Sequence, residues 1–286
     1  MHSRLLAQLA AHIGTDQASL ELRWMKQALS SGLSNATLST MVKRRALGEP
    51  LQYILGTQPF GPLNLLTRPP VLIPRPETEH WVIKLAESMF PTAQNPRNLL
   101  DLGTGSGCIP LLLCHLWPKG SLRTHGIDIS PHALRLANDN AALCGIPTHC
   151  DTDEPQNTYT TSLASFLHTS FPDNEASIKP PYDIVTSNPP YIPWDEYLEL
   201  PRSVSDYEDP KALFGGPSGL DFYHAIARIV SHKNILSPNA VVALEVGYEQ
   251  AEIVESLMRR TGRIHRTEIW GDPWGKQRTV VAHAHA

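Results

Sequence analysis

The sequence lacks the features that mark several other classes of protein. No apolar stretch approaches the roughly 18 residues that a membrane-spanning helix requires, so we expect no membrane partner. The four cysteines form neither a C-x-x-C pair nor a Cys/His pattern with zinc-finger spacing. We therefore expect no metal site, and small buried thiols in a reducing compartment. These residues are Cys108, Cys114, Cys144 and Cys150.

An excess of positive charge is also missing. The formal net charge of the 286 residues is -4, whereas proteins that hold a long phosphate backbone are usually basic. The charge balance therefore argues against nucleic acid as the substrate. The basic run Lys43-Arg44-Arg45 is interpreted as the solvated end of a helix. Residues Met1 to Ile13 carry one arginine and no acid, and a packed first helix explains them better than the remnant of an organelle-targeting peptide.

The spacing of apolar residues divides the chain into three regions. Residues 1–55 have apolar side chains at helical intervals and predict a small helical bundle, with Ser34 as the N-cap of its third helix. Residues 56–74 are rich in glycine, proline and apolar side chains, and they predict a β-hairpin linker. Residues 75–286 alternate apolar strands with helices, which is typical of a doubly wound α/β fold with a parallel sheet.

Two segments of the third region are expected to be irregular. Residues 151–181 are rich in Ser, Thr, Pro, Asp and Asn, and they predict a loop insertion around a short helix near Leu163 to Leu167. The chain ends in His283-Ala284-His285-Ala286, which we interpret as a frayed tail and not as a metal site. Near the start of this region, Arg75 and Glu77 are assigned to the first turn of a helix, with the entrance of a pocket as the alternative.

A glycine-rich turn follows the strand that begins at Leu99. Its glycines let the backbone approach a ligand closely, but their spacing differs from the G-x-G-x-x-G pattern that holds a pyrophosphate. A leading acid, Asp101, would repel a phosphate and attract a cation such as the ammonium of a methionine-like tail. Asp128 ends the next strand, where such folds bind a ribose diol. S-adenosylmethionine (AdoMet) fits both features; a purely structural turn is the alternative. The turn reads Asp101-Leu102-Gly103-Thr104-Gly105-Ser106-Gly107.

A second motif, Asn188-Pro189-Pro190-Tyr191, follows the predicted strand Asp183 to Ser187. The prolines fix the backbone and force Asn188 into an extended conformation at the carboxyl edge of the sheet, where α/β proteins bind ligands. The amide oxygen of Asn188 and nearby carbonyls can accept both N–H bonds of a planar NH2 group, and Tyr191 can lie against its face. The motif therefore predicts a holder for a carboxamide or an exocyclic base amine, with a rigid turn as the alternative.

On these residues the sequence resembles class I AdoMet-dependent methyltransferases, which implies a Rossmann-like, seven-stranded, mostly parallel sheet. Two further stretches resemble the HemK/PrmC family of release-factor glutamine N5-methyltransferases. They are Gly48-Glu49-Pro50-Leu51-Gln52-Tyr53-Ile54-Leu55-Gly56 and Leu72-Ile73-Pro74-Arg75-Pro76-Glu77-Thr78-Glu79. The resemblance implies methyl transfer to the glutamine of the Gly-Gly-Gln loop in a class I peptide chain release factor, which residues 1–55 would contact.

The resemblance also implies residue roles. The turn from Gly103 to Gly107 would line AdoMet, Asp128 would bind its ribose, and Asp151 would lie near its adenine. Asn188 would contact both the cofactor and the glutamine, and Pro189, Pro190 and Tyr191 would complete the amide pocket. We expect Asn188 Oδ1 and the Pro189 carbonyl to accept the two amide N–H bonds, so that positioning supplies most of the rate.

Two other functions remain open at this stage. The first is an adenine-N6 methyltransferase for DNA or rRNA, which would place a flipped base in the same Asn-Pro-Pro-Tyr loop. The second is a non-enzymatic helical adaptor with a degenerate methyltransferase fold. Nothing in the sequence demands a partner chain, so a monomer is expected. The predicted compartment is the mitochondrion in a eukaryote and the cytoplasm otherwise.

Overall fold

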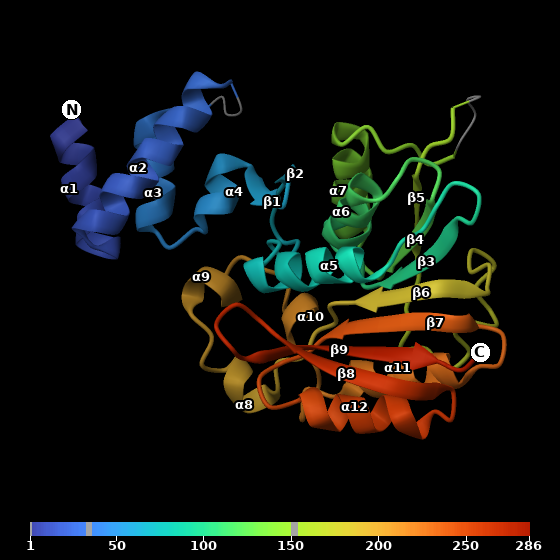
Figure 1. Cartoon of the computed structure of the whole chain (residues 1–286). Helices are drawn as coiled ribbons and strands as arrows, with labels where there is room; N and C mark the ends of the chain where they lie inside the picture. The colour runs from blue at the N-terminus through green and yellow to red at the C-terminus, as the bar shows by residue number, and fades with distance from the viewer. Residues whose placement is uncertain (1, 33–35, 150–153) are drawn as a thin grey trace.

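The computed structural model describes residues 2–32, 36–149 and 154–286 (Figure 1). At its N-terminal end, helices pack around a hydrophobic cluster of their own. Thr37 caps the third of them, because its hydroxyl accepts a hydrogen bond from the backbone N–H of Thr40 at 3.2 Å. The predicted cap, Ser34, lies outside the described residues. The helices are α1 (His2–Ile13), α2 (Thr15–Ser30), α3 (Leu38–Ala46) and α4 (Leu51–Leu55).

A short antiparallel hairpin, β1 (Thr57–Phe60) and β2 (Leu63–Leu66), follows these helices. Phe60 is fully buried in the hydrophobic core on one face of the main sheet. Tyr53 in α4 donates its hydroxyl to the carbonyl of Val71 at 2.6 Å, just beyond the hairpin. The hairpin therefore connects the N-terminal helices to the α/β part of the chain through buried contacts.

The main sheet has seven strands in the order β5-β4-β3-β6-β7-β9-β8. Five neighbours, from β5 to β7, run parallel, and β9 is antiparallel to both β7 and β8. The predicted seven-stranded, mostly parallel sheet is thereby confirmed. Its strands are β3 (Arg97–Leu102), β4 (Leu122–Asp128), β5 (Thr158–Leu163), β6 (Tyr182–Ser187), β7 (Leu236–Glu245), β8 (Ile264–Gly271) and β9 (Gln277–Ala284).

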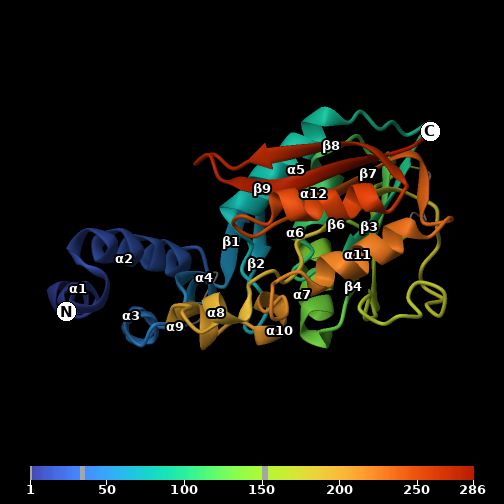
Figure 2. The same ribbon diagram turned by 90° about the horizontal axis from the view of Figure 1, so that it is seen from below.

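Helices cover both faces of the sheet. Figure 2 shows the two helices between Asp221 and Arg260 in front of the strands. Pro76 begins the helix that follows the hairpin, and Glu77 lies in its first turn. A fixed φ and a negative charge both favour a helix start there. No helix among the described residues is both long and apolar enough to cross a membrane. One face carries α5 (Pro76–Ser88), α6 (Cys108–Leu116) and α7 (Pro131–Leu143), and the other carries α11 (Asp221–Ser231) and α12 (Ala251–Arg260).

Both segments that were predicted to be irregular contain some regular structure. The helix expected near Leu163 to Leu167 was wrong, because Thr158–Leu163 forms β5 and pairs with β4 along its whole length, whereas residues 164–181 contain no helix or strand, as a loop should. Its threonines are β-branched and its Tyr159 is fully buried, both of which favour a strand over a polar loop. The prediction of a frayed tail was also wrong for His283 and Ala284, which belong to β9.

Three one-turn helices lie between Asn188 and α11, and the second of them lies nearest to the N-terminal helices in both views (Figures 1 and 2). A proline stands at or just before the first residue of each, which fixes φ for a helical start. Tyr207, in this segment, donates its hydroxyl to the carbonyl of Leu47 at 3.4 Å. The helices are α8 (Trp194–Tyr197), α9 (Arg202–Ser205) and α10 (Pro210–Leu213), and we call residues 194–214 the covering segment.

The sheet reverses its direction of winding at β3, whose neighbours are β4 on one side and β6 on the other. Ligands of open α/β sheets bind outside the carboxyl ends of the strands at such a point. The glycine-rich turn, Asp128 and Asn188 follow these three strands at that edge. The fold therefore brings the sequence motifs to one place.

Candidate active site

The glycine-rich turn is held against β4 by its own backbone. The N–H groups of Gly103 and Thr104 both donate to the carbonyl of Ile127 at 2.9 Å. Gly103, Gly105 and Gly107 have φ values of +73°, +56° and +79°, which other residues rarely adopt. A Cβ on Gly105 would meet nothing within 4 Å, whereas one on Gly107 would meet Tyr159 at 3.2 Å. Gly105 therefore faces open space, and Gly107 serves the packing beneath the turn.

Asp128 fastens the turn from the neighbouring strand. Its Oδ2 accepts the N–H of Gly105 at 2.9 Å, and its Oδ1 accepts the N–H of Ser130 at 2.8 Å. Burial raises the pKa of this carboxyl, and the backbone hydrogen bonds oppose that rise. Asp128 also lines the adjoining cavity, and its two oxygens have more acceptor sites than these backbone groups use.

The polar side chains of the turn point into the fold. Asp101 is fully buried, and its Oδ1 accepts the hydroxyl of Thr186 at 2.7 Å. Burial raises the pKa of Asp101 to about 6, and its Oδ2 has no partner among the described residues. The Thr104 hydroxyl is 2.8 Å from that of Tyr159, and Ser106 is also buried. Of the predicted turn residues, only Gly103 and Gly105 line the cavity.

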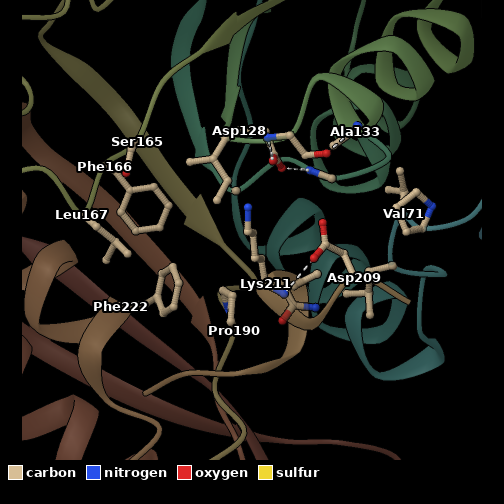
Figure 3. Close-up of a pocket in the computed structure, with 18 residues that line it drawn as sticks. Val71, Asp128, Ala133, Ser165, Phe166, Leu167, Pro190, Asp209, Lys211 and Phe222 are labelled. Carbon is tan, nitrogen blue, oxygen red and sulfur yellow. Dashed lines mark hydrogen bonds between the residues drawn. The ribbon is translucent and has the colours of Figure 1, made fainter. Parts of the chain in front are cut away.

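The first cavity lies above this turn and, together with the solvent space at its mouth, contains about 750 Å³ of empty space. Figure 3 shows Phe166, Leu167 and Phe222 together on one side and Val71 on the other. The rings of Phe166 and Phe222 are 5.8 Å apart and meet edge to face. Lys211 extends into the space between the two sides (Figure 3).

Sequence reasoning missed these walls. Phe166 and Leu167 follow the carboxyl end of β5, so a correct assignment of that strand would have located them. Val71 and Lys211 come from distant segments, and no local pattern marks them. Asp151, which was assigned to the adenine, lies outside the described residues.

Asn188 lines both this cavity and a second one beneath the covering segment. Its Nδ2 donates to the hydroxyl of Thr78 at 3.1 Å, and its Oδ1 has no donor among the described residues. The second cavity contains about 710 Å³ of empty space. Pro190 lines only the first cavity. The second is lined by Leu72, Arg75, Asn188, Pro189, Tyr191, Ile192, Leu200, Val204, Ala212 and Leu213.

The Asn-Pro-Pro-Tyr loop is rigidly packed. The carbonyl of Tyr191 accepts the side-chain amide of Gln250 at 2.9 Å. A Cβ on Gly219 would approach the same carbonyl to 2.3 Å, so only glycine fits there. Ile192 N–H donates to the carbonyl of Leu213 at 3.0 Å, which ties the loop to the covering segment. These contacts hold the backbone around Asn188 in one conformation.

An ion pair closes one side of the second cavity. Arg75 Nη2 contacts both carboxylate oxygens of Glu208 at 2.7 Å, and Glu208 is almost completely buried. Burial raises the pKa of Glu208, and Arg75 opposes that rise. Arg75 therefore belongs to the pocket wall as well as to the cap position of α5, whereas Glu77 does not line this cavity.

Other reactive groups do not contribute to the site. Burial raises the pKa of Cys108 and of Cys114 to about 12, so neither is a nucleophile. Within the described ranges, no three His, Cys, Asp or Glu side chains are grouped so that they could hold a metal ion. The arrangement offers two adjoining cavities, a fixed carboxylate on one and a carboxamide between them.

Comparison with known proteins adds a relative that spans most of the chain. No family model matches the sequence. The release factor glutamine methyltransferase of Geobacter sulfurreducens is 35% identical over 254 residues, which cover 89% of this chain and 80% of that protein.

Two solved structures resemble the fold. A methyltransferase from Pyrococcus furiosus has a TM-score of 0.51 and 14% identity, covering 78% of this chain and 90% of its own. The hMettl16 catalytic domain, solved in complex with the MAT2A 3'UTR hairpin 1, has a TM-score of 0.57 and 17% identity, covering 86% and 80%. At these identities the likeness concerns the methyltransferase fold alone, and the hairpin carries no information about the substrate of this chain.

Proposed function

Because this chain belongs to the release factor glutamine methyltransferase family, we propose that it methylates a class I peptide chain release factor. The methyl group goes from AdoMet to the N5 side-chain amide of the glutamine in the Gly-Gly-Gln loop, which supports translation termination. The observation that carries the proposal is the position of Asn188, which lines both cavities and leaves its Oδ1 without an internal donor.

The first cavity suits AdoMet. Gly103 and Gly105 would bring backbone close to the ligand, and the carboxylate of Asp128, which lines the cavity, would accept a hydrogen bond from the ribose diol. Phe166 and Phe222 supply an apolar wall for the adenine. Asp101, buried beneath the turn, contributes a negative potential when ionised, which favours the positive sulfonium and ammonium. When bound, AdoMet supplies an electrophilic methyl group, and its product is S-adenosylhomocysteine.

The second cavity suits the glutamine side chain. Its walls are mainly apolar, and its one cation, Arg75, is already paired with Glu208. Asn188 Oδ1 and the Pro189 carbonyl accept the two N–H bonds of the glutamine amide. This aims the nitrogen at the methyl group and stabilises the positive charge that develops on nitrogen. The new C–N bond forms as the C–S bond breaks, and the nitrogen then loses a proton to water.

The remaining assignments concern partners and location. The N-terminal helices α1–α4 contact the release factor, and the chain works as a monomer. In a eukaryote the enzyme acts in the mitochondrion, and in a bacterium it acts in the cytoplasm. Base methylation has no support beyond the Asn-Pro-Pro-Tyr loop that both reactions would use.

Radiolabelled AdoMet distinguishes these substrates directly. The purified chain is incubated with a class I release factor, with the same factor carrying alanine in place of the loop glutamine, and with DNA or rRNA. Label in the first sample alone supports the proposal, and mass spectrometry of the loop peptide locates the methyl group. Label in the nucleic acid, or equal label in both release factors, contradicts it.

A further inference from the structure

A buried chain of hydrogen bonds runs behind Asn188, on the side away from the two cavities. Asn188 Nδ2 is 3.1 Å from Thr78 Oγ1, and that hydroxyl is 2.6 Å from Glu245 Oε2. The indole N–H of Trp81 donates to the same Oε2 at 2.9 Å. Thr78, Trp81 and Glu245 are each 1% exposed. The chain therefore links the end of β6 to the first turns of α5 and to the end of β7.

The direction of each bond follows from the chemistry of Trp81. An indole N–H can only donate, so Glu245 Oε2 must accept. As long as Oε2 carries no proton, the single proton of the Thr78 hydroxyl is donated to it, and Thr78 Oγ1 then accepts from Asn188 Nδ2. The group that Asn188 directs at Thr78 must therefore be its NH2. These directions hold whether Glu245 is charged or carries a proton on Oε1.

We propose that Thr78, Glu245 and Trp81 are positioning residues that fix the orientation of the Asn188 carboxamide, with its Oδ1 directed at the substrate amide. This inference rests on the proposed function. A carboxamide turned by half a rotation would present its NH2 to the NH2 of the glutamine, so the substrate nitrogen would lose an acceptor. We call the hydrogen bonds from Asn188 through Thr78 to Glu245 and Trp81 the relay. The relay excludes the turned orientation before substrate binds, and Asn188 remains the residue that contacts the substrate.

The composition of the relay supports this role over simple packing. Burying a carboxylate without a cation costs free energy, and within the described residues Glu245 forms no ion pair. Burial accordingly raises the pKa of Glu245, against the hydrogen bonds from Thr78 and Trp81. An apolar residue would fill the same space at lower cost. Glu245 offers what an apolar residue lacks, which is an acceptor with a fixed direction.

The test compares Thr78→Val with Thr78→Ser. Valine has nearly the shape of threonine but no hydroxyl, whereas serine keeps the hydroxyl. A matched control is Thr124→Val in β4, which removes an equally buried hydroxyl that donates to the carbonyl of Thr158 at 2.8 Å, away from both cavities. For each variant we measure kcat and KM on a release factor, the AdoMet Kd by calorimetry, and the melting temperature.

We expect Thr78→Val to lower kcat roughly 10- to 100-fold, as a misplaced catalytic group does, while the AdoMet Kd stays within about twofold. Thr78→Ser restores kcat to within about threefold of the unsubstituted enzyme, and Thr124→Val leaves it within about twofold. An unchanged kcat in Thr78→Val, or equal losses in the valine and serine variants, overturns the relay. If Thr78→Val does not fold, Trp81→Phe replaces it, with a lower kcat expected and an unchanged kcat overturning the relay.

A readout that does not need turnover separates this inference from the proposed function. The side-chain amide of Asn188 gives a pair of ¹H–¹⁵N signals, which are identified by their loss in Asn188→Ala. We expect slow proton exchange for this pair in the unsubstituted chain and in Thr78→Ser, and fast exchange in Thr78→Val. Equal exchange in all three overturns the relay. If the protein shows the expected proton exchange but methylates no release factor, the proposed function is contradicted and the relay is still supported.

Discussion

The cavity above the glycine-rich turn and the cavity beneath the covering segment share Asn188 but differ in their chemistry. The first is built around backbone groups and the carboxylate of Asp128, with aromatic side chains on one wall. The second is lined mainly by apolar side chains and by Arg75, whose charge Glu208 balances. Asp128 and Asp209 outnumber Lys211 in the first cavity, so its charges favour the positively charged ligand that we propose, whereas the second suits a neutral side chain.

This difference predicts which measured quantity each substitution changes. A change in the first cavity acts on the AdoMet Kd, and a change in the second acts on the KM for the release factor. A change at Asn188, where the cavities meet, or at the residues that orient it, acts chiefly on kcat. Three substitutions test this separation, and a fourth tests the carboxyl buried beneath the first cavity.

The largest effect is expected for Asn188→Ala. Loss of the amide removes an acceptor that stabilises the transition state, and removing one such group costs roughly 100- to 1,000-fold in kcat. The AdoMet Kd should stay within about threefold, because the turn and Asp128 are intact. Stopped-flow methyl transfer and calorimetry measure the two quantities. Equal losses in kcat and in AdoMet affinity would mean that Asn188 only supports the cofactor cavity.

The second-largest effect is expected for Asp128→Ala, which should change the AdoMet Kd alone because Asp128 lines only the first of the two cavities. It would remove the carboxylate proposed to bind the ribose, and it releases the N–H of Gly105. We expect the AdoMet Kd to rise about 100-fold, which corresponds to about 2.7 kcal/mol, while the KM for the release factor changes little. The control is Asp139→Ala, which removes a half-exposed carboxylate in α7. A KM that rises as much as the Kd would show that the cavities are not separable.

The third effect concerns the free energy of unfolding, which should depend on pH through Asp101, a residue buried beneath the first cavity. The pKa of Asp101 is raised from 3.8 to about 6 in the folded chain, so the folded state binds more protons than the unfolded state between these values. Its contribution to stability is complete below the lower value and is lost as the pH rises through the upper one. Relative to Asp101→Asn, the unfolding free energy of the unsubstituted chain should fall by up to roughly 3 kcal/mol between about pH 3 and pH 7. Urea unfolding at several pH values measures it, and a constant difference would contradict the raised pKa.

Sequence reasoning located the centre of the site better than its walls. Gly105, Asp128 and Asn188 each lie at or just beyond the carboxyl end of a strand, so a local pattern and the rule for open α/β sheets place them at one edge. The direction of a side chain is harder to infer. Asp101 was expected to face a ligand, but the strand turns it toward Thr186 on β6.

The walls depend on tertiary structure. Phe166 was hidden because the polar residues of β5 were interpreted as a loop, although their β-branched side chains and pairing with β4 favour a strand. Val71 and Lys211 reach the first cavity from segments that are far apart in the chain. The contact of Asn188 with Thr78 likewise joins residues 110 positions apart. No periodicity in the sequence reports such contacts.

The smallest effect is expected in the second cavity, for Leu200→Ala. Leu200 lines this cavity, and a partly buried leucine side chain contributes up to about 2 kcal/mol when a ligand covers it. Because the glutamine covers only part of the wall, we expect the KM for the release factor to rise roughly 3- to 10-fold, with the AdoMet Kd unchanged. The control is Leu198→Ala, two positions away and 66% exposed, which should alter neither quantity. If both leucine variants raise the KM equally, the covering segment binds the release factor through its outer surface, and the second cavity does not select the glutamine.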